Sequence, residues 1–315
     1  MTIELKERFV KDMGLPIKIF EEPYFENLLR LFEFENGAYQ KYCRFKELVE
    51  SHKSVDEFFK DCYEFREKAI EYLNQSPEML YFSQNEDMSK YGIVNKGFPA
   101  NEIYKETFDG DFFVSIDMIK GNFTALRHYN PLIVGGKNTY EEFAGMFTDI
   151  PYLIESKYLR QVIFGNVNPK RQVTYEKYLM DKVLTRLFEK GFSKESVVFF
   201  NTDEIVLKVS EENVIDGVVK QELCQVVESV VLEMVQQNIN VRFEVFQLRK
   251  IPGSMGYVKK FQYNKFGHVF KKVNHLEYPF VLRAYNGEKY QDIDCVFLYE
   301  GKKAMLLDIP QITVV

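Results

Sequence analysis

Tryptophan is absent from this 315-residue chain, and cysteine and histidine are rare, with four residues of each. The cysteines are widely spaced and form no CxxC pair, which argues against a disulfide framework and against a zinc site. No apolar run approaches the roughly 20 residues that span a bilayer. The charged start, MTIELKERFVKDMG, lacks the apolar core of a secretion signal. These absences predict a soluble cytoplasmic protein that does not enter a membrane.

Apolar residues make up 46% of the chain, and phenylalanine and tyrosine are abundant, with 29 and 20 residues. A chain of this length and composition can bury a large core, divided into two or three domains. The richness in Lys, Asn, Phe and Tyr would also fit an AT-rich genome such as that of a virus or phage.

The net charge of −6 hides a basic segment, because residues 245–276 contain seven Lys or Arg residues and no acid. Aromatic residues alternate with these cations. Cations attract phosphates and flat apolar rings stack on bases, so the segment favours binding of a nucleic-acid strand. The predicted contacts are Tyr257, Lys259, Lys260 and Lys265. An amphipathic β-hairpin with a solvated lysine face explains the same pattern equally well.

The hydrophobic pattern predicts an α+β fold with three regions. Residues 1–90 carry apolar residues at helical spacing, with a helix start at Ser54 and Glu57. Residues 91–250 alternate between strands and helices, which predicts an antiparallel sheet packed by helices on one side. Expected strands are 102–108, 111–118, the pair within 196–209, and 239–250; expected helices include 138–147, 170–191 and 213–238. Residues 251–315 are predicted to be β-rich and basic.

Two adjacent acids interrupt the apolar run SVVFFNTDEIVLKV at residues 196–209, where Asp203 and Glu204 lie at the expected turn. They either solvate the tip of a hairpin or hold a cation. Asp117 ends another expected strand, and two adjacent strands would bring it close to Asp203. Carboxylates that close repel each other unless a cation lies between them, and oxygen-only ligands favour Mg²⁺ or Mn²⁺. Asp117 and Asp203 are therefore the candidate metal ligands.

These motifs occur in an order that resembles the palm domain of reverse transcriptases and viral RNA polymerases, over residues 105–262. Asp117 with Gly121, Asn122 and Phe123 is similar to the first palm motif, and FFNTDEIVL is similar to the acid-bearing hairpin. Between them, GNVNPKRQVTYEKYLMDKVL occupies the place of a loop and long helix. The segment GSMGYVKKF resembles the hairpin that grips a primer.

The resemblance implies a template-dependent nucleotidyltransferase that extends a nucleic-acid 3′ end by a two-metal mechanism, with nucleoside triphosphates as substrates. Asp117 and Asp203 would bind the metals, and Glu204 would be a third ligand. Lys250, at the end of an expected strand, would hold phosphates or protonate the leaving pyrophosphate.

The same resemblance assigns nucleotide contacts. Lys170 and Arg171 begin a predicted helix, where free N–H groups and cations would cradle a triphosphate. Asn122 and Phe123 would contact the nucleotide itself. Because Asn122 is polar where DNA-making enzymes carry a bulky aromatic, ribonucleotides are not excluded. The N-terminal helices would be available to a protein partner.

The sequence departs from the palm pattern in places. Glu204 stands where a second Asp is usual, and Asn201 stands where related turns have an Asp. The tRNA-His guanylyltransferases carry a Ser-Asp-Glu hairpin that Thr202-Asp203-Glu204 resembles, but they need Gly directly after the first Asp, where this chain has Met118. Two other hypotheses remain open: a non-catalytic nucleic-acid-binding or viral assembly protein on a degenerate palm, and an interaction protein whose hairpin acids are merely solvated.

Overall fold

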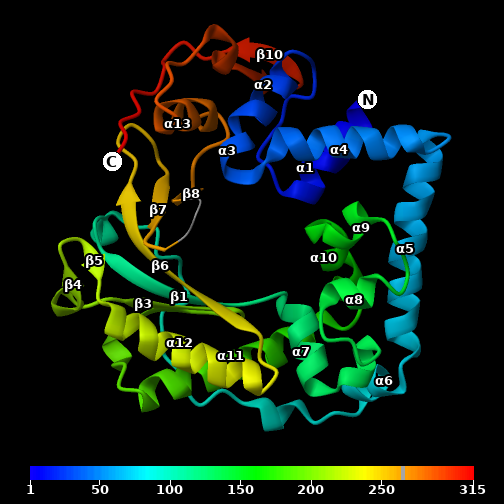
Figure 1. Cartoon of the computed structure of the whole chain (residues 1–315), viewed down its shortest axis with the longest axis vertical. Helices are drawn as coiled ribbons and strands as arrows, with labels where there is room; N and C mark the ends of the chain where they lie inside the picture. Colours follow the sequence, from blue (N-terminus) through cyan, green and yellow to red (C-terminus); the bar gives the residue numbers. More distant parts are fainter. Residues whose placement is uncertain (264–266) are drawn as a thin grey trace.

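The computed structural model describes residues 1–263 and 267–315. It confirms the predicted α+β class: helices fill the N-terminal region, and a six-stranded antiparallel sheet forms the centre (Figure 1). The strand order is β2-β3-β1-β6-β7-β8. The strands are β1 (Phe112–Met118), β2 (Val197–Phe200), β3 (Glu204–Lys208), β6 (Val241–Lys250), β7 (Tyr257–Phe261) and β8 (His268–Lys271).

Six helices precede the sheet in the sequence. They are α1 (Ile3–Met13), α2 (Tyr24–Leu31), α3 (Glu33–Asn36), α4 (Ala38–Ser51), α5 (Val55–Gln75) and α6 (Pro77–Gln84). Helix α5 begins where the sequence predicts it, because the Ser54 hydroxyl accepts a hydrogen bond from the Glu57 N–H at 3.2 Å. Its buried residues, including Phe58, Phe65 and Leu73, recur at helical spacing and face the core.

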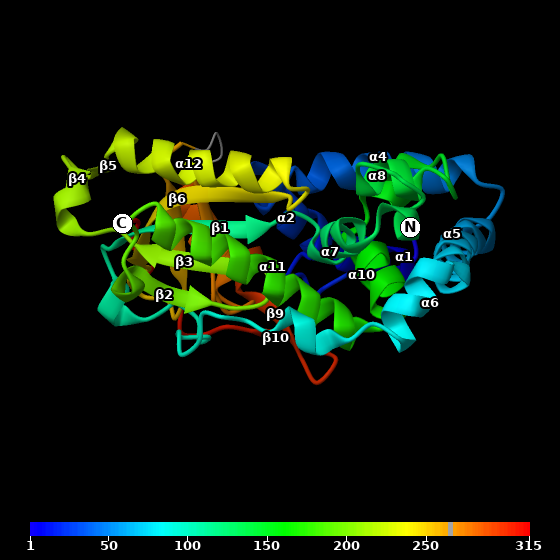
Figure 2. The ribbon, with the colours of Figure 1, turned by 90° about the horizontal axis from the view of Figure 1, so that it is seen from below.

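The central part of the sheet is built in the β-α-β-β-α-β order of the split βαβ motif. After β1 the chain forms α7 (Gly121–Tyr129), α8 (Tyr140–Ala144), α9 (Pro151–Glu155), α10 (Lys157–Gly165) and α11 (Pro169–Glu189). The hairpin β2–β3 follows, then α12 (Gln221–Gln236) and β6. Helices α11 and α12 lie along one face of the sheet (Figure 2).

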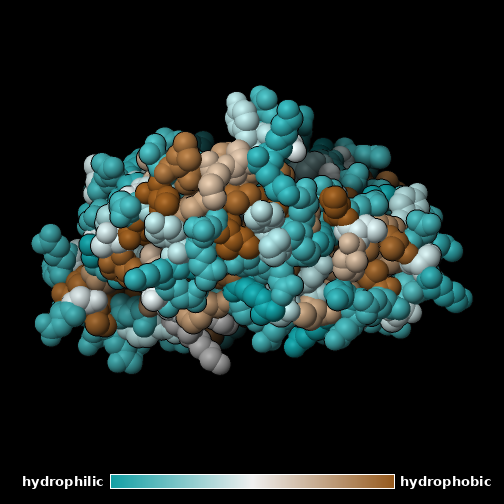
Figure 3. Space-filling model, turned by 90° about the horizontal axis from the view of Figure 1, so that it is seen from above, coloured by the Kyte–Doolittle hydropathy of each residue, from teal (hydrophilic) through white to brown (hydrophobic). Residues whose placement is uncertain are grey.

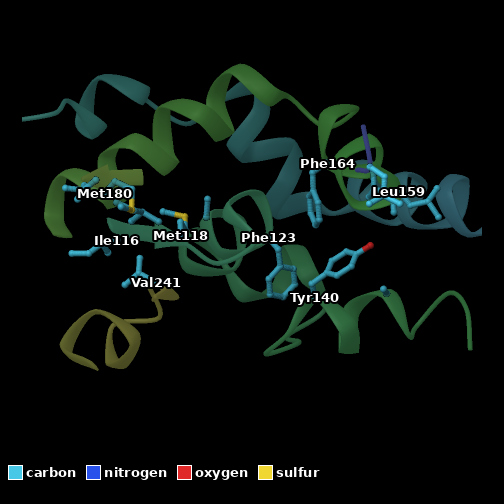
Figure 4. Packing of buried hydrophobic residues seen from close by; sticks show 14 of the residues in the cluster. Ile116, Met118, Phe123, Tyr140, Leu159, Phe164, Met180 and Val241 are labelled. Atoms are coloured by element: carbon cyan, nitrogen blue, oxygen red, sulfur yellow. The ribbon is translucent and has the colours of Figure 1, made fainter. Parts of the chain in front are cut away.

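The two faces of the sheet differ, because neighbouring residues of a strand point to opposite sides. On β1, Ile116 and Met118 face the helices and join the main core, where they lie near Met180 and Val241 (Figure 4). Phe113 belongs to a second buried cluster on the opposite face. We call this opposite face, which carries Phe113, Ser115 and Asp117, the open face. Phe113 and Ser115 on this face are buried, whereas the Asp117 side chain at its end is 34% exposed.

Several sequence predictions about single elements are wrong. Residues 102–108 form irregular chain and a short 3-10 turn (Glu106–Phe108), not a strand. The helix predicted at 213–238 begins only at Gln221, because Asp216 and Gly217 both have positive φ and close a small ribbon of β4 (Val214–Ile215) and β5 (Val218–Val219). Two consecutive positive-φ residues are typical of a tight hairpin turn.

The region after residue 250 is less purely β than predicted. Strands β7 and β8 extend the central sheet across the expected boundary at 250, and a helix, α13 (Tyr278–Tyr285), follows them. A separate hairpin of β9 (Val296–Tyr299) and β10 (Lys302–Met305) follows α13. From the side of this hairpin, the surface shows small apolar patches scattered among polar residues (Figure 3). Tyr299, Met305 and Leu307 are among the exposed apolar residues of this region.

The N-terminal helices contact three later elements: α13, strand β8 and helix α10. The Arg283 guanidinium on α13 donates hydrogen bonds to Asp294 at 2.9 Å and to Asn27 of α2 at 3.0 Å. Phe34 of α3 stacks on His268 of β8, with ring centroids 5.9 Å apart. Helices α1 and α5 contact α10. In Figure 1 this arrangement appears as an arch of α4 and α5 that joins the two sides of the molecule. None of the helices in the described residues is long and apolar enough to cross a bilayer.

Candidate active site

Three predicted acids meet at one end of strands β1 and β3. Asp117 is the direct cross-strand partner of Glu204. The next backbone contact joins the Met118 N–H to the Asp203 carbonyl oxygen at 2.8 Å. Residues paired in this way have Cβ atoms about 5 Å apart. The antiparallel pairing of β1 with β3 therefore brings Asp117, Asp203 and Glu204 into one place.

Asp117 and Glu204 share the open face, and each already contacts protein groups. Asp117 Oδ2 accepts a hydrogen bond from Arg242 Nη2 at 3.2 Å. Glu204 Oε1 accepts from the Ser115 hydroxyl at 2.5 Å and lies 3.9 Å from Lys259 Nζ. The open face thus carries two acids on the neighbouring strands β3 and β1, followed by two cations on β6 and β7.

A fourth acid, Glu176, joins the cluster from helix α11. Its side chain is buried, and its Oε1 accepts a hydrogen bond from Asn122 Nδ2 at 2.9 Å. The carboxylate lies against Gly121, so a Cβ added there would be 3.5 Å from it. Glu176 is not among the residues that the sequence motifs predict for the site. One pattern in the sequence points to it. Glu176 precedes Leu179 by three residues and Met180 by four, so it lies on the buried side of the predicted helix.

The pKa values of three acids in the cluster are raised, because burial disfavours their charged forms and nearby cations only partly offset it. Burial, opposed by Arg242 and reinforced by the charge of Asp203, raises the pKa of Asp117 to about 6. Burial also raises the pKa of Asp203, with a further contribution from Glu204. Glu176 has its pKa raised to about 7 by burial and by the charge of Asp203. Each of these carboxylates gains stability as an anion if a cation arrives.

The donor set fits a hard divalent cation. All of the candidate ligands are carboxylate oxygens, which suit Mg²⁺ or Mn²⁺. Within the described parts of the chain, no three His, Cys, Asp or Glu side chains already converge as a ready-made metal cage. Mg²⁺ is commonly held by only one or two carboxylates, and the substrate phosphates and water complete its shell. Asp117 and Asp203, the predicted ligands, are two carboxylates close enough for the charge of Asp203 to raise the pKa of Asp117.

Three cations belong to the segment from the start of α7 to α10: Lys120, Lys157 and Arg160. The Lys157 charge at the start of α10 is close enough to lower the pKa of Asp203 in opposition to the burial effect. The Arg160 guanidinium lies over the Tyr140 ring, 5.6 Å from its centroid, and is half-buried. Lys120, directly before α7, is paired with Glu141. Of these cations, Lys157 is the one whose charge acts on an acid of the cluster, whereas Lys120 and Arg160 lie next to Glu141 and Tyr140.

Two of the other predicted nucleotide contacts, Phe123 and Arg171, contact protein groups and have structural roles. Phe123 is buried in the core, near Tyr140 and Phe164 (Figure 4). Arg171 Nη1 donates to the backbone oxygens of Phe82 and Glu86, at 2.8 and 2.7 Å, and so closes the end of α6. Lys170 is exposed at the start of α11. Asn122 is the predicted nucleotide contact that lies within the acid cluster.

Lys250 lies far from the acids. Arg242 of β6 is the cross-strand partner of Asp117. Lys250 lies eight residues further along the same strand, which corresponds to about 27 Å. Its Nζ lies over the Tyr257 ring, 4.7 Å from the centroid. The structure therefore places Arg242, not Lys250, beside the acid cluster.

The predicted nucleic-acid contacts are mostly part of the sheet. Tyr257 and Lys259 are both buried, and Lys259 Nζ lies 4.3 Å from the centroid of the Phe246 ring. Lys260 is partly exposed. Lys265 lies outside the described residues. Tyr257 in this packing has no free face for a base to stack on.

No protein-family model, no curated protein and no solved structure matches this chain. Its function is therefore inferred from the chemistry of the site itself.

Proposed function

We propose that this protein is a metal-dependent nucleotidyltransferase, which extends a nucleic-acid 3′ end on a template with nucleoside triphosphates. The observation that carries the proposal is the meeting of Asp117 and Asp203 at adjacent strand ends, with Glu204 and Glu176 beside them. Such a cluster is costly without a cation. Its place at the end of a β-α-β-β-α-β sheet also agrees with the palm resemblance of the motifs.

Asp117 and Asp203 would hold one or two Mg²⁺ or Mn²⁺ ions. When bound, such ions activate the attacking oxygen and neutralise the leaving pyrophosphate. Glu204 would act as a further ligand on the open face, because it is the cross-strand partner of Asp117. Glu176 would fix Asn122 through their hydrogen bond and keep the loop before α7 in place.

The surrounding cations would act on the phosphates. Arg160, which has no carboxylate within ion-pair distance in the described residues, would bind non-bridging phosphate oxygens. Arg242 would leave Asp117 when a metal arrives, since its side chain is largely exposed. Asn122 donates to Glu176 through Nδ2, which leaves its Oδ1 for a ribose hydroxyl, so that ribonucleotides remain possible substrates.

A second candidate function is a non-catalytic nucleic-acid-binding protein. The observation that favours it is that Asp117 and Glu204 each already have a protein cation, Arg242 and Lys259. If these ion pairs are permanent, the acids organise the open face and bind no metal. This candidate predicts salt-sensitive binding of nucleic acid without nucleotide incorporation.

Primer extension with Mg²⁺ or Mn²⁺ tests the proposal. The wild-type protein should incorporate nucleotides, and Asp203→Asn should reduce the rate by at least about a hundredfold. Asp216→Asn is the matched control, because Asp216 is exposed on the β4–β5 turn and Asn tolerates its positive φ. Incorporation that survives Asp203→Asn would refute the assignment. Absence of incorporation by the wild type, together with salt-sensitive binding, would favour the second candidate.

A further inference from the structure

Lys259 is a buried cation in the middle of the sheet. It lies on β7, opposite Leu248 of β6 and Val269 of β8, and its side chain is only 7% exposed. Its Nζ lies 4.3 Å from the centroid of the Phe246 ring. A lysine is almost never fully buried unless it is paired. An ammonium group enclosed in this way needs acids around it and cannot turn out into water.

Three acids of the open face supply negative charge around Lys259. Glu204 Oε1 lies 3.9 Å from its Nζ. Glu244 of β6 and Asp117 of β1 lie on the same face, two residues apart in the register of these strands. Burial lowers the pKa of Lys259, and Lys271 adds to this effect, whereas the charges of Glu204, Glu244 and Asp117 oppose it. These three carboxylates therefore favour a cation at the place where Lys259 lies.

Two buried groups hold the same oxygen of Glu204. The Ser115 hydroxyl, on a residue that is 2% exposed, donates to Glu204 Oε1 at 2.5 Å, and Lys259 Nζ approaches this oxygen as well. A divalent ion bound to Oε1 at about 2 Å would lie within about 6 Å of the ammonium group, where like charges repel. Oε1 is therefore not available to a metal ion, which leaves Oε2 as the oxygen available to an ion at Asp117.

The cation beside Asp117 differs from Lys259 in its exposure. Arg242 Nη2 lies 3.2 Å from Asp117 Oδ2, but the Arg242 side chain is 61% exposed. An exposed ion pair contributes little free energy, so a metal ion can replace Arg242 and the guanidinium can move into water. A buried ammonium group has no such alternative. Asp117 can therefore exchange its protein cation for a metal ion, whereas Glu204 keeps Lys259.

We propose that Lys259 occupies the place of a second metal ion, so that the protein itself holds a single divalent ion, between Asp117 and Asp203. The inference rests on the proposed function, because it concerns the ions of the same acid cluster. The fixed ammonium group supplies the positive charge beside Glu204 that a second ion would bring. Lys259 is then a positioning residue, which holds Glu204 from inside the sheet, and not a contact for a nucleic-acid strand.

The test counts bound Mn²⁺ by electron paramagnetic resonance, without nucleotide. The wild type should bind one ion per chain. Lys259→Met should bind two, because it removes the charge, packs against the Phe246 ring and frees Glu204 Oε1. Lys259→Arg keeps the charge and should bind one. Lys260→Met is the matched control, because Lys260 is the next residue of β7, is partly exposed and lies on the other face of the sheet.

A double variant locates the additional ion. Lys259→Met combined with Glu204→Gln should bind one ion again, because the carboxylate that would hold the second ion is gone. Thermal unfolding of each variant checks that the fold is intact. Two ions on the wild type would overturn the inference without any variant, and so would a single ion on a stable Lys259→Met protein; both results leave the proposed function standing. A wild type that binds no Mn²⁺ would refute the proposed function and the inference together.

Discussion

Glu35 gives a stability prediction that tests how the N-terminal helices close onto the sheet. It lies on α3, beside β8, where its carboxylate accepts a backbone hydrogen bond from Phe270. Its Oε1 is buried and has no hydrogen-bond partner among the described residues. Burial raises its pKa from 4.5 to about 7, against the opposing effects of Phe270 and Lys271. The ionised carboxylate is therefore disfavoured in the folded protein.

The sign of the pH dependence follows from proton binding. Between pH 4.5 and about 7 the folded state keeps the Glu35 proton and the unfolded state has lost it, so the free energy of unfolding falls as the pH rises. The stabilising contribution is complete below pH 4.5 and lost above about pH 7. At about 1.4 kcal/mol for each pH unit, the loss is about 3 kcal/mol.

Glu35→Gln should remove this loss, because an amide stays neutral and still accepts the Phe270 hydrogen bond. The measurement is denaturant unfolding of variant and wild type from pH 4.5 to pH 8. The variant should match the wild type at the acid end and exceed it by about 3 kcal/mol at pH 8. Glu47→Gln, at an exposed position of α4, is the control for loss of one negative charge. A Glu35→Gln difference that stays constant with pH would refute the reasoning.

Three further predictions concern single contacts. Gly253→Ala should lower the free energy of unfolding by more than about 1 kcal/mol, because Gly253 has a φ of 82° and its Cβ would lie 2.1 Å from the Gln311 carbonyl oxygen; unchanged denaturant unfolding would contradict this contact. Arg171→Met should lower the melting temperature and leave the affinity for labelled ATP unchanged, because the guanidinium binds backbone oxygens at the end of α6. Loss of ATP affinity at unchanged stability would instead support Arg171 as a nucleotide contact. Asp12→Ala should cost about 3 kcal/mol in denaturant unfolding, because it leaves the partly buried Arg8, with a side chain 15% exposed, without its charge partner; a cost below about 1 kcal/mol would show that the Arg8 charge is satisfied elsewhere.

Local patterns in the sequence predict the strongest elements of this fold. The apolar run around Asp117 predicts β1, and the two acids between apolar runs predict the β2–β3 hairpin; both are confirmed. The α+β class follows from the change of periodicity along the chain. In contrast, the apolar pattern predicts a helix across Asp216 and Gly217, because apolar residues on both sides conceal a two-residue turn.

Residues contributed by distant elements could not be predicted from local patterns. Glu176 and Arg242 reach the acid cluster only through the packing of α11 and the register of β6 on β1. The same register places Lys250 at the opposite end of the strand. A hydrophobic pattern indicates which face of a strand is buried, but not which residue of a distant strand lies opposite it. The sequence alone therefore identifies the acids and leaves open the cations that accompany them.

The central claim is that Asp117 and Asp203 share a divalent cation. The most direct measurement is a crystal structure with Mn²⁺ and a non-hydrolysable nucleoside triphosphate, in which anomalous scattering locates the metal. The proposed function predicts an anomalous peak about 2.0–2.3 Å from an oxygen of each carboxylate, with Arg242 displaced from Asp117. A map with no peak between these carboxylates, and with Arg242 still bound to Asp117 Oδ2, would contradict it.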